Sequence, residues 1–320
     1  MRRVVILGIV LAGCVAFTPD DPIGRSAQPL RYGDVKPLAQ VFVKGRGAVD
    51  VEGDYLPKVV CCENAAAHPE ALKAQAVMAR TYMYFRYWGE DLGKEEKPLT
   101  GTVADQAYFC NNTATDACRT AVRATKDQVM TFEEGGVVYA NVAFFIDGPK
   151  PACLADKDCS CPKPGPDVSM TPEDHPACDC FTIGSPGAAS PKYLTYNWSR
   201  TGADVIGSSL GNPQHESNHG CASQNIQSCL GHAGWSYHDQ LRFFYGQDIQ
   251  LRAADGTVVE PSTTPPVTTA PAERSDDPLR SEDDGGCAIG RRRAPLVAPV
   301  AGLTSLRSCA LGLRARRRRG

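Results

Sequence analysis

The sequence predicts an α+β domain, and three observations support this fold class. Two segments between residues 55 and 87 have helical periodicity, and several short strand-like segments follow between residues 128 and 198. All three tryptophans fall within residues 45–251, which marks this stretch as the folded unit. Helices and strands mixed along one stretch of chain are typical of an α+β core.

The first helical segment runs from Tyr55 to Glu63. Asp54 can cap its N-terminus, and Pro57 falls in the first turn, where proline is tolerated. Residues 49–52 alternate between valine and an acidic residue, which predicts a short strand before this helix.

The second helical segment runs from Pro69 to about Tyr87. One face is apolar, and small residues widen it, so we expect a helix that is packed on more than one side. The residues of the face and of its margins are Leu72, Ala76, Ala79 and Met83, with Ala71, Ala74 and Val77.

Strands are predicted at Gln128–Phe132, Val137–Phe145 and Tyr193–Trp198. Gly135 and Gly136 separate the first two strands and indicate a hairpin.

Composition divides the rest of the chain. Residues 15–44 are polar and are expected to form a disordered tether, and residues 252–285 are expected to form a linker that is rich in proline and threonine and then acidic. Residues 286–320 are arginine-rich and resemble a degenerate C-terminal sorting signal; the alternative is a solvated basic tail. The net charge is −2, so no overall field favours nucleic acid.

Residues 1–14 are typical of an export signal. Two arginines precede an apolar run that is too short to span a bilayer. The run ends in Leu11-Ala12-Gly13-Cys14, which resembles a lipobox and predicts lipidation at Cys14. The alternative is an ordinary secretory signal that is cut near Phe17. We expect an exported lipoprotein of the outer membrane, periplasm or cell surface.

Eleven cysteines lie in the folded unit, and export to an oxidising compartment favours disulfides. An odd number leaves at least one thiol outside these bridges. Residues 149–181 form a cysteine-rich insertion with little apolar content, so cross-links are expected to order it. Connectivity cannot be assigned from sequence, but two pairs are spaced for local bridges. The disulfide candidates are Cys153, Cys159, Cys161, Cys178 and Cys180 in the insertion, with the local pairs Cys110 and Cys118, and Cys221 and Cys229.

Zinc is the competing interpretation of the insertion, and apart from it no cofactor is expected. The insertion contains a sufficient tetrahedral ligand set. The alternative zinc ligands are Cys159, Cys161, His175, Cys178 and Cys180.

Glu63 is the sharpest candidate for chemistry. In a helix it shares a face with Leu56, Val59 and Val60, because seven residues span about two turns. Partial burial of a carboxyl raises its pKa and suits it to donate a proton near neutral pH. The alternative is an exposed or salt-bridged residue at a helix end.

Three blocks in order resemble the SpoIID/LytB family. Residues 51–82 contain VEGDYLPKVVCCE and then EALKAQAVMARTY, which is similar to the family signature at almost every position of its second part. Residues 102–130 and 218–246 are similar to the two later blocks of the family. The resemblance covers about residues 45–251 and implies a SpoIID-like domain.

The resemblance implies that Glu63 is the catalytic acid of a lytic transglycosylase. The acid would protonate the oxygen between N-acetylmuramic acid and N-acetylglucosamine, and the sugar's own 6-hydroxyl would then close a 1,6-anhydro end. No water attacks, so the carboxylate pair of ordinary glycoside hydrolases is not needed.

Further residues in the matching blocks are candidates for glycan binding. His219 is expected to contact substrate or to position Glu63, or else to be a turn residue. Arg80 is expected to face the groove, or else to form a structural ion pair. The substrate-binding candidates are His219, Ser223, Gln224 and Arg80.

LytB-like members imply an alternative, which is a non-catalytic module that binds glycan or stimulates a partner amidase or other cell-wall hydrolase. Departures from the family pattern motivate it: Asn64 and Ala65 follow Glu63 in place of Met-Pro, and residues 143–148 replace a serine-rich strand. In both cases the expected partner is the glycan strand of peptidoglycan. Sporulation is an association of the family only.

Overall fold

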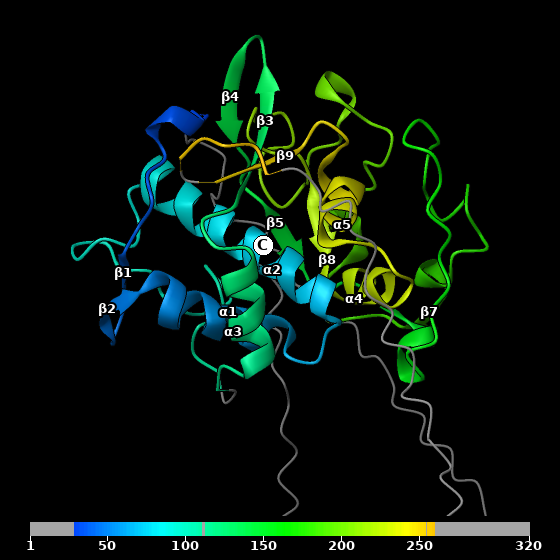
Figure 1. Cartoon of the computed structure of the whole chain (residues 1–320), viewed down its shortest axis with the longest axis horizontal. Helices are drawn as coiled ribbons and strands as arrows, with labels where there is room; N and C mark the ends of the chain where they lie inside the picture. The colour runs from blue at the N-terminus through cyan, green and yellow to red at the C-terminus, as the bar shows by residue number, and fades with distance from the viewer. Residues whose placement is uncertain (1–28, 111–112, 254, 260–320) are drawn as a thin grey trace, which may run out of the picture. The chain divides into compact units, whose positions relative to one another are not determined.

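The computed structural model describes residues 29–110, 113–253 and 255–259. The predicted export signal, Cys14 and the sorting tail lie outside the described residues, as does most of the linker. The described residues belong to one compact unit of mixed helices and strands, which confirms the α+β prediction (Figure 1). Among them, none of the helices has both the length and the apolar character that a membrane span requires.

Helix α2 (Pro69–Tyr84) runs through the middle of the domain. It packs against α1 (Leu56–Asn64) and α3 (Asp116–Ala124) on one side, and against α4 (Gln224–His232) and α5 (Tyr237–Tyr245) on the other (Figure 1). Thirteen of its sixteen residues are buried, which confirms that it is packed on more than one side.

Two apolar clusters meet on α2. Leu72, Ala76, Ala79 and Met83 face the cluster that contains α1 and α3. The opposite face belongs to a second cluster with the strands and the C-terminal helices. Its α2 members are Ala74, Val77, Met78 and Tyr82.

The chain enters α1 through a hairpin of β1 (Gln40–Val43) and β2 (Gly47–Asp50), followed by the π-helical turn η2 (Val51–Tyr55). The strand predicted over residues 49–52 therefore ends earlier, at Asp50, and the predicted helix cap at Asp54 is wrong. The Asp50 side chain accepts the Gly53 N–H instead, so helical structure begins at Val51. Helix α2 likewise ends earlier than predicted, in the π-helical turn η3 (Phe85–Gly89).

A three-stranded antiparallel sheet has the order β4-β3-β9, with β3 (Val129–Glu134), β4 (Val137–Ala140) and β9 (Gln250–Arg252). The predicted hairpin at Gly135-Gly136 is confirmed, and both glycines have the positive φ that such a turn requires.

The long strand predicted over Val137–Phe145 is divided in two. Its second part, β5 (Phe144–Ile146), leaves the hairpin and pairs in parallel with β8 (Cys221–Ser223). Residues 141–143 carry the change of direction, and Ala143 has φ 57°.

The strand predicted at Tyr193–Trp198 is wrong. Tyr193 ends the short 3-10 turn η6 (Pro191–Tyr193), and residues 194–198 form no strand. The backbone there bonds to two different elements: Thr195 N–H donates to Cys221 and Asn197 N–H donates to Phe243. Without one continuous partner strand, no ladder forms. Other short turns are η1 (Tyr32–Asp34), η4 (Ala152–Ala155), η5 (Asp179–Phe181) and η7 (Gly202–Asp204).

Disulfides hold the cysteine-rich insertion, and a small ladder of β6 (Lys150–Pro151) and β7 (Ile183–Ser185) closes its base. The bridges are Cys153–Cys159, Cys161–Cys178 and Cys180–Cys229, and the last ties the insertion to α4. The local pair Cys221–Cys229 is therefore wrong. Cys221 is instead a free, buried thiol on β8, in agreement with the odd cysteine count.

The alternative zinc ligands do not fit a metal centre. The sulfurs of Cys161, Cys178 and Cys180 lie within 4.8 Å of one another, but each is oxidised in a disulfide and is not available as a thiolate ligand. His175 is half-buried, and its Nε2 lies 2.6 Å from the carbonyl oxygen of Ser169.

Candidate functional site

Glu63 lies in the last turn of α1. Leu56, Val59 and Val60 are fully buried on this helix, and Glu63 is partly buried. The helix therefore carries a carboxyl to the edge of an apolar core, as the spacing of these residues predicts.

Both carboxylate oxygens of Glu63 accept hydrogen bonds from distant parts of the chain. The backbone N–H of Ala107 donates to Oε1 at 2.9 Å, and the side-chain Nε2 of Gln224 donates to Oε2 at 3.1 Å. Gln224 is the first residue of α4, so the first and last sequence blocks meet at Glu63. Asn64 adds a second contact, from its Nδ2 to the Gln224 carbonyl at 3.3 Å.

The environment raises the pKa of Glu63 above its usual value. Burial is the main cause, because it penalises the charged form, and the negative charge of Asp147 acts in the same direction. The hydrogen bonds from Ala107 and Gln224 stabilise the carboxylate and oppose the rise. The result is a carboxyl that is poised to hold a proton nearer to neutral pH.

Asp147 reaches the site through the parallel strand pair. In the register of β5 and β8, Ile146 lies opposite Ser223, so the next residues, Asp147 and Gln224, emerge at the same end. The Asp147 carboxylate accepts backbone N–H bonds from Gly148 at 2.8 Å, Ala188 at 2.6 Å and Ala189 at 2.9 Å. This carboxylate is therefore committed to holding the loop that follows the insertion.

Residues 100–110, here called the site loop, supply the Ala107 N–H. Asp105 accepts the Arg86 guanidinium at 2.7 Å. Gln106 donates its Nε2 to the Ala79 carbonyl at 3.0 Å and accepts the hydroxyl of Tyr55 at 3.2 Å. These contacts fix the loop on η3, α2 and η2, immediately before Ala107.

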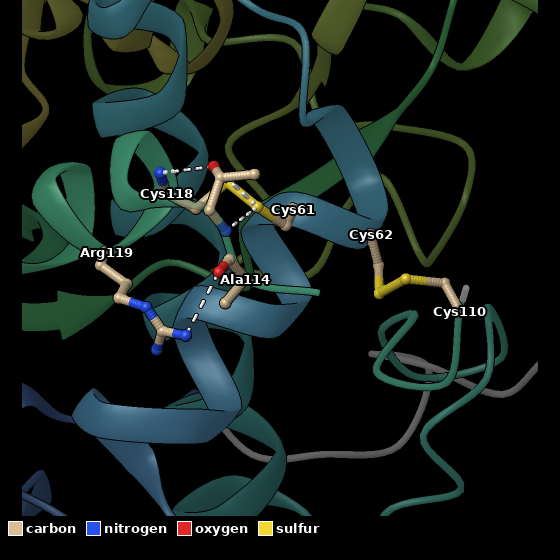
Figure 2. The surroundings of a disulfide bond; sticks show 7 residues. Cys61, Cys62, Cys110, Ala114, Cys118 and Arg119 are labelled. Carbon is tan, nitrogen blue, oxygen red and sulfur yellow. Dashed lines mark hydrogen bonds between the residues drawn. A yellow bond between two sulfur atoms is a disulfide. The ribbon is translucent and has the colours of Figure 1, made fainter. Parts of the chain in front are cut away.

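Two disulfides leave α1 directly before Glu63. Cys61 is bonded to Cys118 on α3, and Cys62 is bonded to Cys110 at the end of the site loop. Figure 2 shows that these neighbouring cysteines leave the helix in different directions. The predicted local pair Cys110–Cys118 is therefore wrong, because each of these cysteines bonds to α1 instead.

The other predicted glycan-binding residues occupy different positions. Ser223 is fully buried and caps α4, and its hydroxyl donates to the Asp147 carbonyl at 3.1 Å. His219 stacks on Phe132 with ring centroids 3.6 Å apart, and burial lowers its pKa to about 4. No hydrogen bond joins His219 to Glu63 within the described residues.

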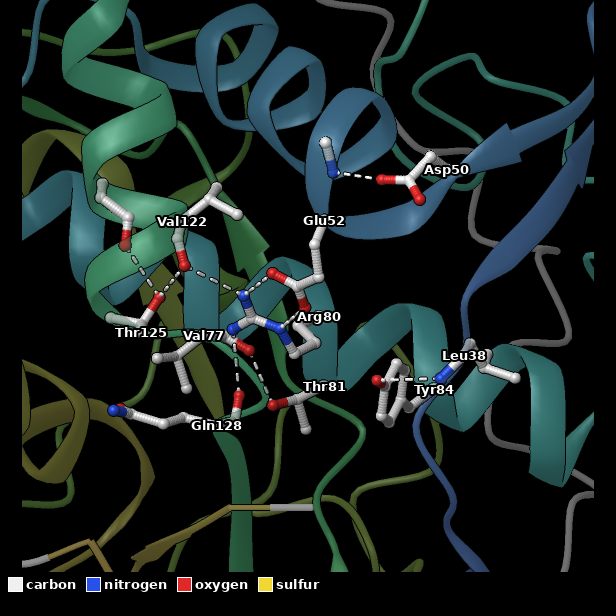
Figure 3. A network of polar contacts seen from close by, with 12 residues as sticks. Leu38, Asp50, Glu52, Val77, Arg80, Thr81, Tyr84, Val122, Thr125 and Gln128 are labelled. Carbon is white, nitrogen blue, oxygen red and sulfur yellow. Dashed lines mark hydrogen bonds and ion pairs between the residues drawn. The ribbon is translucent and has the colours of Figure 1, made fainter.

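Arg80 forms the structural ion pair that was the alternative to glycan binding. Its side chain has no exposed surface and makes a two-point contact with Glu52, Nε to Oε1 at 2.7 Å and Nη2 to Oε2 at 2.8 Å. Nη1 also donates to the Gln128 carbonyl at 3.2 Å. Figure 3 shows the guanidinium between Glu52, Val122 and Gln128, so it has no open face for a sugar.

Several groups around Glu63 are not evident from the sequence. The Ala107 donor is a backbone group, which has no residue-type signature. Asp147 lies in the segment that departs from the family pattern. Cys61 and Cys62 directly precede Glu63, and their adjacency was the available signal for a covalent constraint there.

Comparison with known protein families identifies a similarity over part of the chain. Residues 47–132 match the family model SpoIID, described as stage II sporulation protein. Comparison with curated proteins gives no match. The matched segment holds α1, α2 and the site loop, whereas Asp147 and Gln224 lie beyond it. Residues 47–132, the segment that carries Glu63, are therefore similar to the SpoIID family.

Proposed function

We propose that this protein is a peptidoglycan lytic transglycosylase that cleaves the linkage between N-acetylmuramic acid and N-acetylglucosamine and leaves 1,6-anhydro ends. The observation that carries the proposal is the Glu63 carboxyl, partly buried with a raised pKa in the segment that matches the SpoIID family. A carboxyl of this kind is suited to protonate a glycosidic oxygen.

Gln224 suits an acid that loses and regains its proton. Its amide presents Nε2 to the ionised carboxylate at 3.1 Å. Rotation of the same amide by half a turn presents its oxygen, which accepts a hydrogen bond from the protonated acid. The residue can therefore support Glu63 in both states of the cycle.

The engagement of Asp147 supports a mechanism with a single acid. A hydrolase needs a second carboxylate that activates water or attacks the sugar. Asp147 already accepts three backbone N–H bonds, so it is not free for either task. Attack by the sugar's own 6-hydroxyl needs no such group: Glu63 gives its proton to the leaving oxygen and takes one from the hydroxyl.

An oxidising location outside the cytoplasm belongs to the same proposal. Five disulfides join ten cysteines of the described residues, and such bridges persist in exported proteins. Lipidation at Cys14 would hold the enzyme at a membrane beside the glycan strands.

The test is digestion of glycan strands stripped of stem peptides, with mass spectrometry of the products. Wild type is expected to release 1,6-anhydro fragments, and Glu63→Gln to lower the rate by at least about 100-fold while still binding glycan. Glu134→Gln, an exposed glutamate on β3, is the matched control and should retain full activity. Equal rates for wild type and Glu63→Gln would remove Glu63 from the mechanism.

The second candidate function is a glycan-binding module that enhances an amidase. The observation in its favour is that both oxygens of Glu63 already accept hydrogen bonds from the protein. On this reading wild type and Glu63→Gln retain glycan in a pull-down equally and stimulate a cell-wall amidase equally, and neither forms anhydro products.

A further inference from the structure

The last turn of α1 carries two cystines in succession, and Glu63 follows them. Helix α1 ends at Asn64, so Glu63 lies where the final carbonyls of a helix have no intrahelical partner and the backbone frays. Covalent bonds at Cys61 and Cys62 oppose this fraying. They differ in what they attach to the helix.

Cys61 attaches α1 to another helix. Its partner Cys118 lies in the first half of α3, with the two Cα atoms 5.8 Å apart. Neither Cys118 nor its neighbours in α3 donates a hydrogen bond to Glu63 in the described part of the chain. This bridge fastens two elements of the core.

Cys62 attaches α1 to the site loop, the source of the Ala107 donor. Its partner Cys110 has its Cα 5.7 Å from that of Cys62 and lies three residues after Ala107. The Cys62 sulfur also lies 3.6 Å from the carbonyl oxygen of Tyr108. The short span that contains Ala107 thus runs between Gln106, held by Ala79 and Tyr55, and a covalent bond to the residue before Glu63.

We propose that the Cys62–Cys110 bridge is a positioning link for Glu63: it keeps the Ala107 N–H within hydrogen-bonding distance of the Glu63 carboxyl. The neighbouring Cys61–Cys118 bridge stabilises the fold but does not influence the protonation of Glu63. The inference rests on the proposed function, in which Glu63 is the proton donor.

The link has a defined electrostatic consequence. The Ala107 bond lowers the pKa of Glu63, so slackening of the site loop raises that pKa further. The other groups that face the carboxyl stay in place: Gln224, the charge of Asp147 and the buried hydroxyl of Tyr55. Asp105 on the same loop remains paired with Arg86.

The experiment compares two double variants, Cys62→Ser with Cys110→Ser and Cys61→Ser with Cys118→Ser. The closed loops span 48 and 57 residues, so removal of either bridge should lower the unfolding midpoint by a similar amount. Only the Cys62/Cys110 variant is expected to lose at least about tenfold in kcat per folded molecule and to shift the basic limb of its pH profile upward.

A second readout does not depend on activity. The Glu63 carboxyl carbon is titrated by NMR in wild type and in both double variants, and its pKa is expected to rise in the Cys62/Cys110 variant alone. If wild type forms no product but this difference is seen, the proposed function fails and the positioning link stands. If the Glu63 titration moves equally in both variants, or in neither, the link is overturned.

Gly101→Ala disturbs the same loop with every disulfide intact. The Gly101 carbonyl accepts the N–H groups of Tyr108 and Phe109, and an added Cβ would lie 2.7 Å from the Phe109 ring. The variant is expected to raise the Glu63 pKa as the Cys62/Cys110 variant does. Gly45→Ala, at a similar positive φ with open space around it, is the control and should leave Glu63 unchanged. If a cysteine variant does not fold, an unchanged Glu63 pKa in Gly101→Ala would still overturn the link, because the site loop would then have no influence on the acid.

Discussion

At the scale of single residues, Glu63 accepts hydrogen bonds from the Ala107 N–H and the Gln224 side chain. Its spacing on an apolar helix face and the matching motif identify it, and Gln224 follows from the third motif block. The sequence could not reveal the Ala107 donor, because any residue other than proline offers the same N–H. The sequence also could not show that Gln224, and not its buried neighbour Ser223, contacts Glu63, because only the fold decides which side chain reaches the acid.

Gln224→Leu tests the electrostatics of the acid. Loss of the Nε2 donor removes a bond that favours the carboxylate, so the pKa of Glu63 rises. The protonated, active form then persists to higher pH, and the basic limb of kcat/KM is expected to move up by as much as about one pH unit. Activity measured between pH 5 and 9 gives the shift.

Gln227→Leu is the control for this shift. Gln227 lies on the same helix and is fully buried, but its amide lies beside the Met78 sulfur and not beside Glu63. Its pH profile should match that of wild type. A downward shift of the basic limb in Gln224→Leu would contradict the assignment of the protonated form as active.

At the scale of elements, the spacing of apolar residues predicted the positions of the helices better than the residues at which they begin and end. The cores of α1 and α2 follow from the spacing of their apolar residues. Their π-helical extensions, η2 and η3, follow no such period and were not predicted. The parallel pair of β5 and β8 was also beyond the sequence, since three-residue strands far apart in the chain carry no signal of their pairing.

Arg80→Met tests the ion pair that joins η2 to α2. Removal of the guanidinium leaves the Glu52 carboxylate without its partner and the buried Gln128 carbonyl without this donor, so we expect a loss of about 3 kcal/mol in unfolding free energy. Denaturant unfolding measures the loss, and activity per folded molecule should be unchanged.

Arg123→Met provides the comparison for Arg80. Arg123 is exposed on α3, and its side chain bonds only to the Thr120 hydroxyl among the contacts described, so the loss of unfolding free energy should stay within about 0.5 kcal/mol. Full stability of Arg80→Met combined with a raised KM for glycan would restore Arg80 to the list of substrate-binding residues.

At the scale of the whole molecule, disulfides order the insertion, which has little apolar content, and connect it to α4. The sequence predicted that this segment would be cross-linked, because it has little apolar content. It could not predict the pairing, since the bridge partners are chosen by contacts such as Cys180 with Cys229 on α4.

The stabilising effect of these bridges should follow the length of chain that each encloses. Removal of Cys180–Cys229, with a sequence separation of 49, is expected to lower the unfolding free energy by about 4 kcal/mol. Removal of Cys153–Cys159, with a separation of 6, should lower it by only about 2 kcal/mol. Urea unfolding of the two double alanine variants makes the comparison, and a larger loss for the short loop would show that local packing dominates.

The meeting of Glu63 with Gln224 has a consequence for biosynthesis. The two residues are 161 positions apart, and the glutamate leaves the ribosome first. A nascent chain that has emerged only as far as the cysteine-rich insertion contains the acid and its helix, but it lacks α4 and the strand that pairs with β5. Completion of the site thus requires the chain as far as α4, and a product truncated in the insertion carries the motif without the assembled centre.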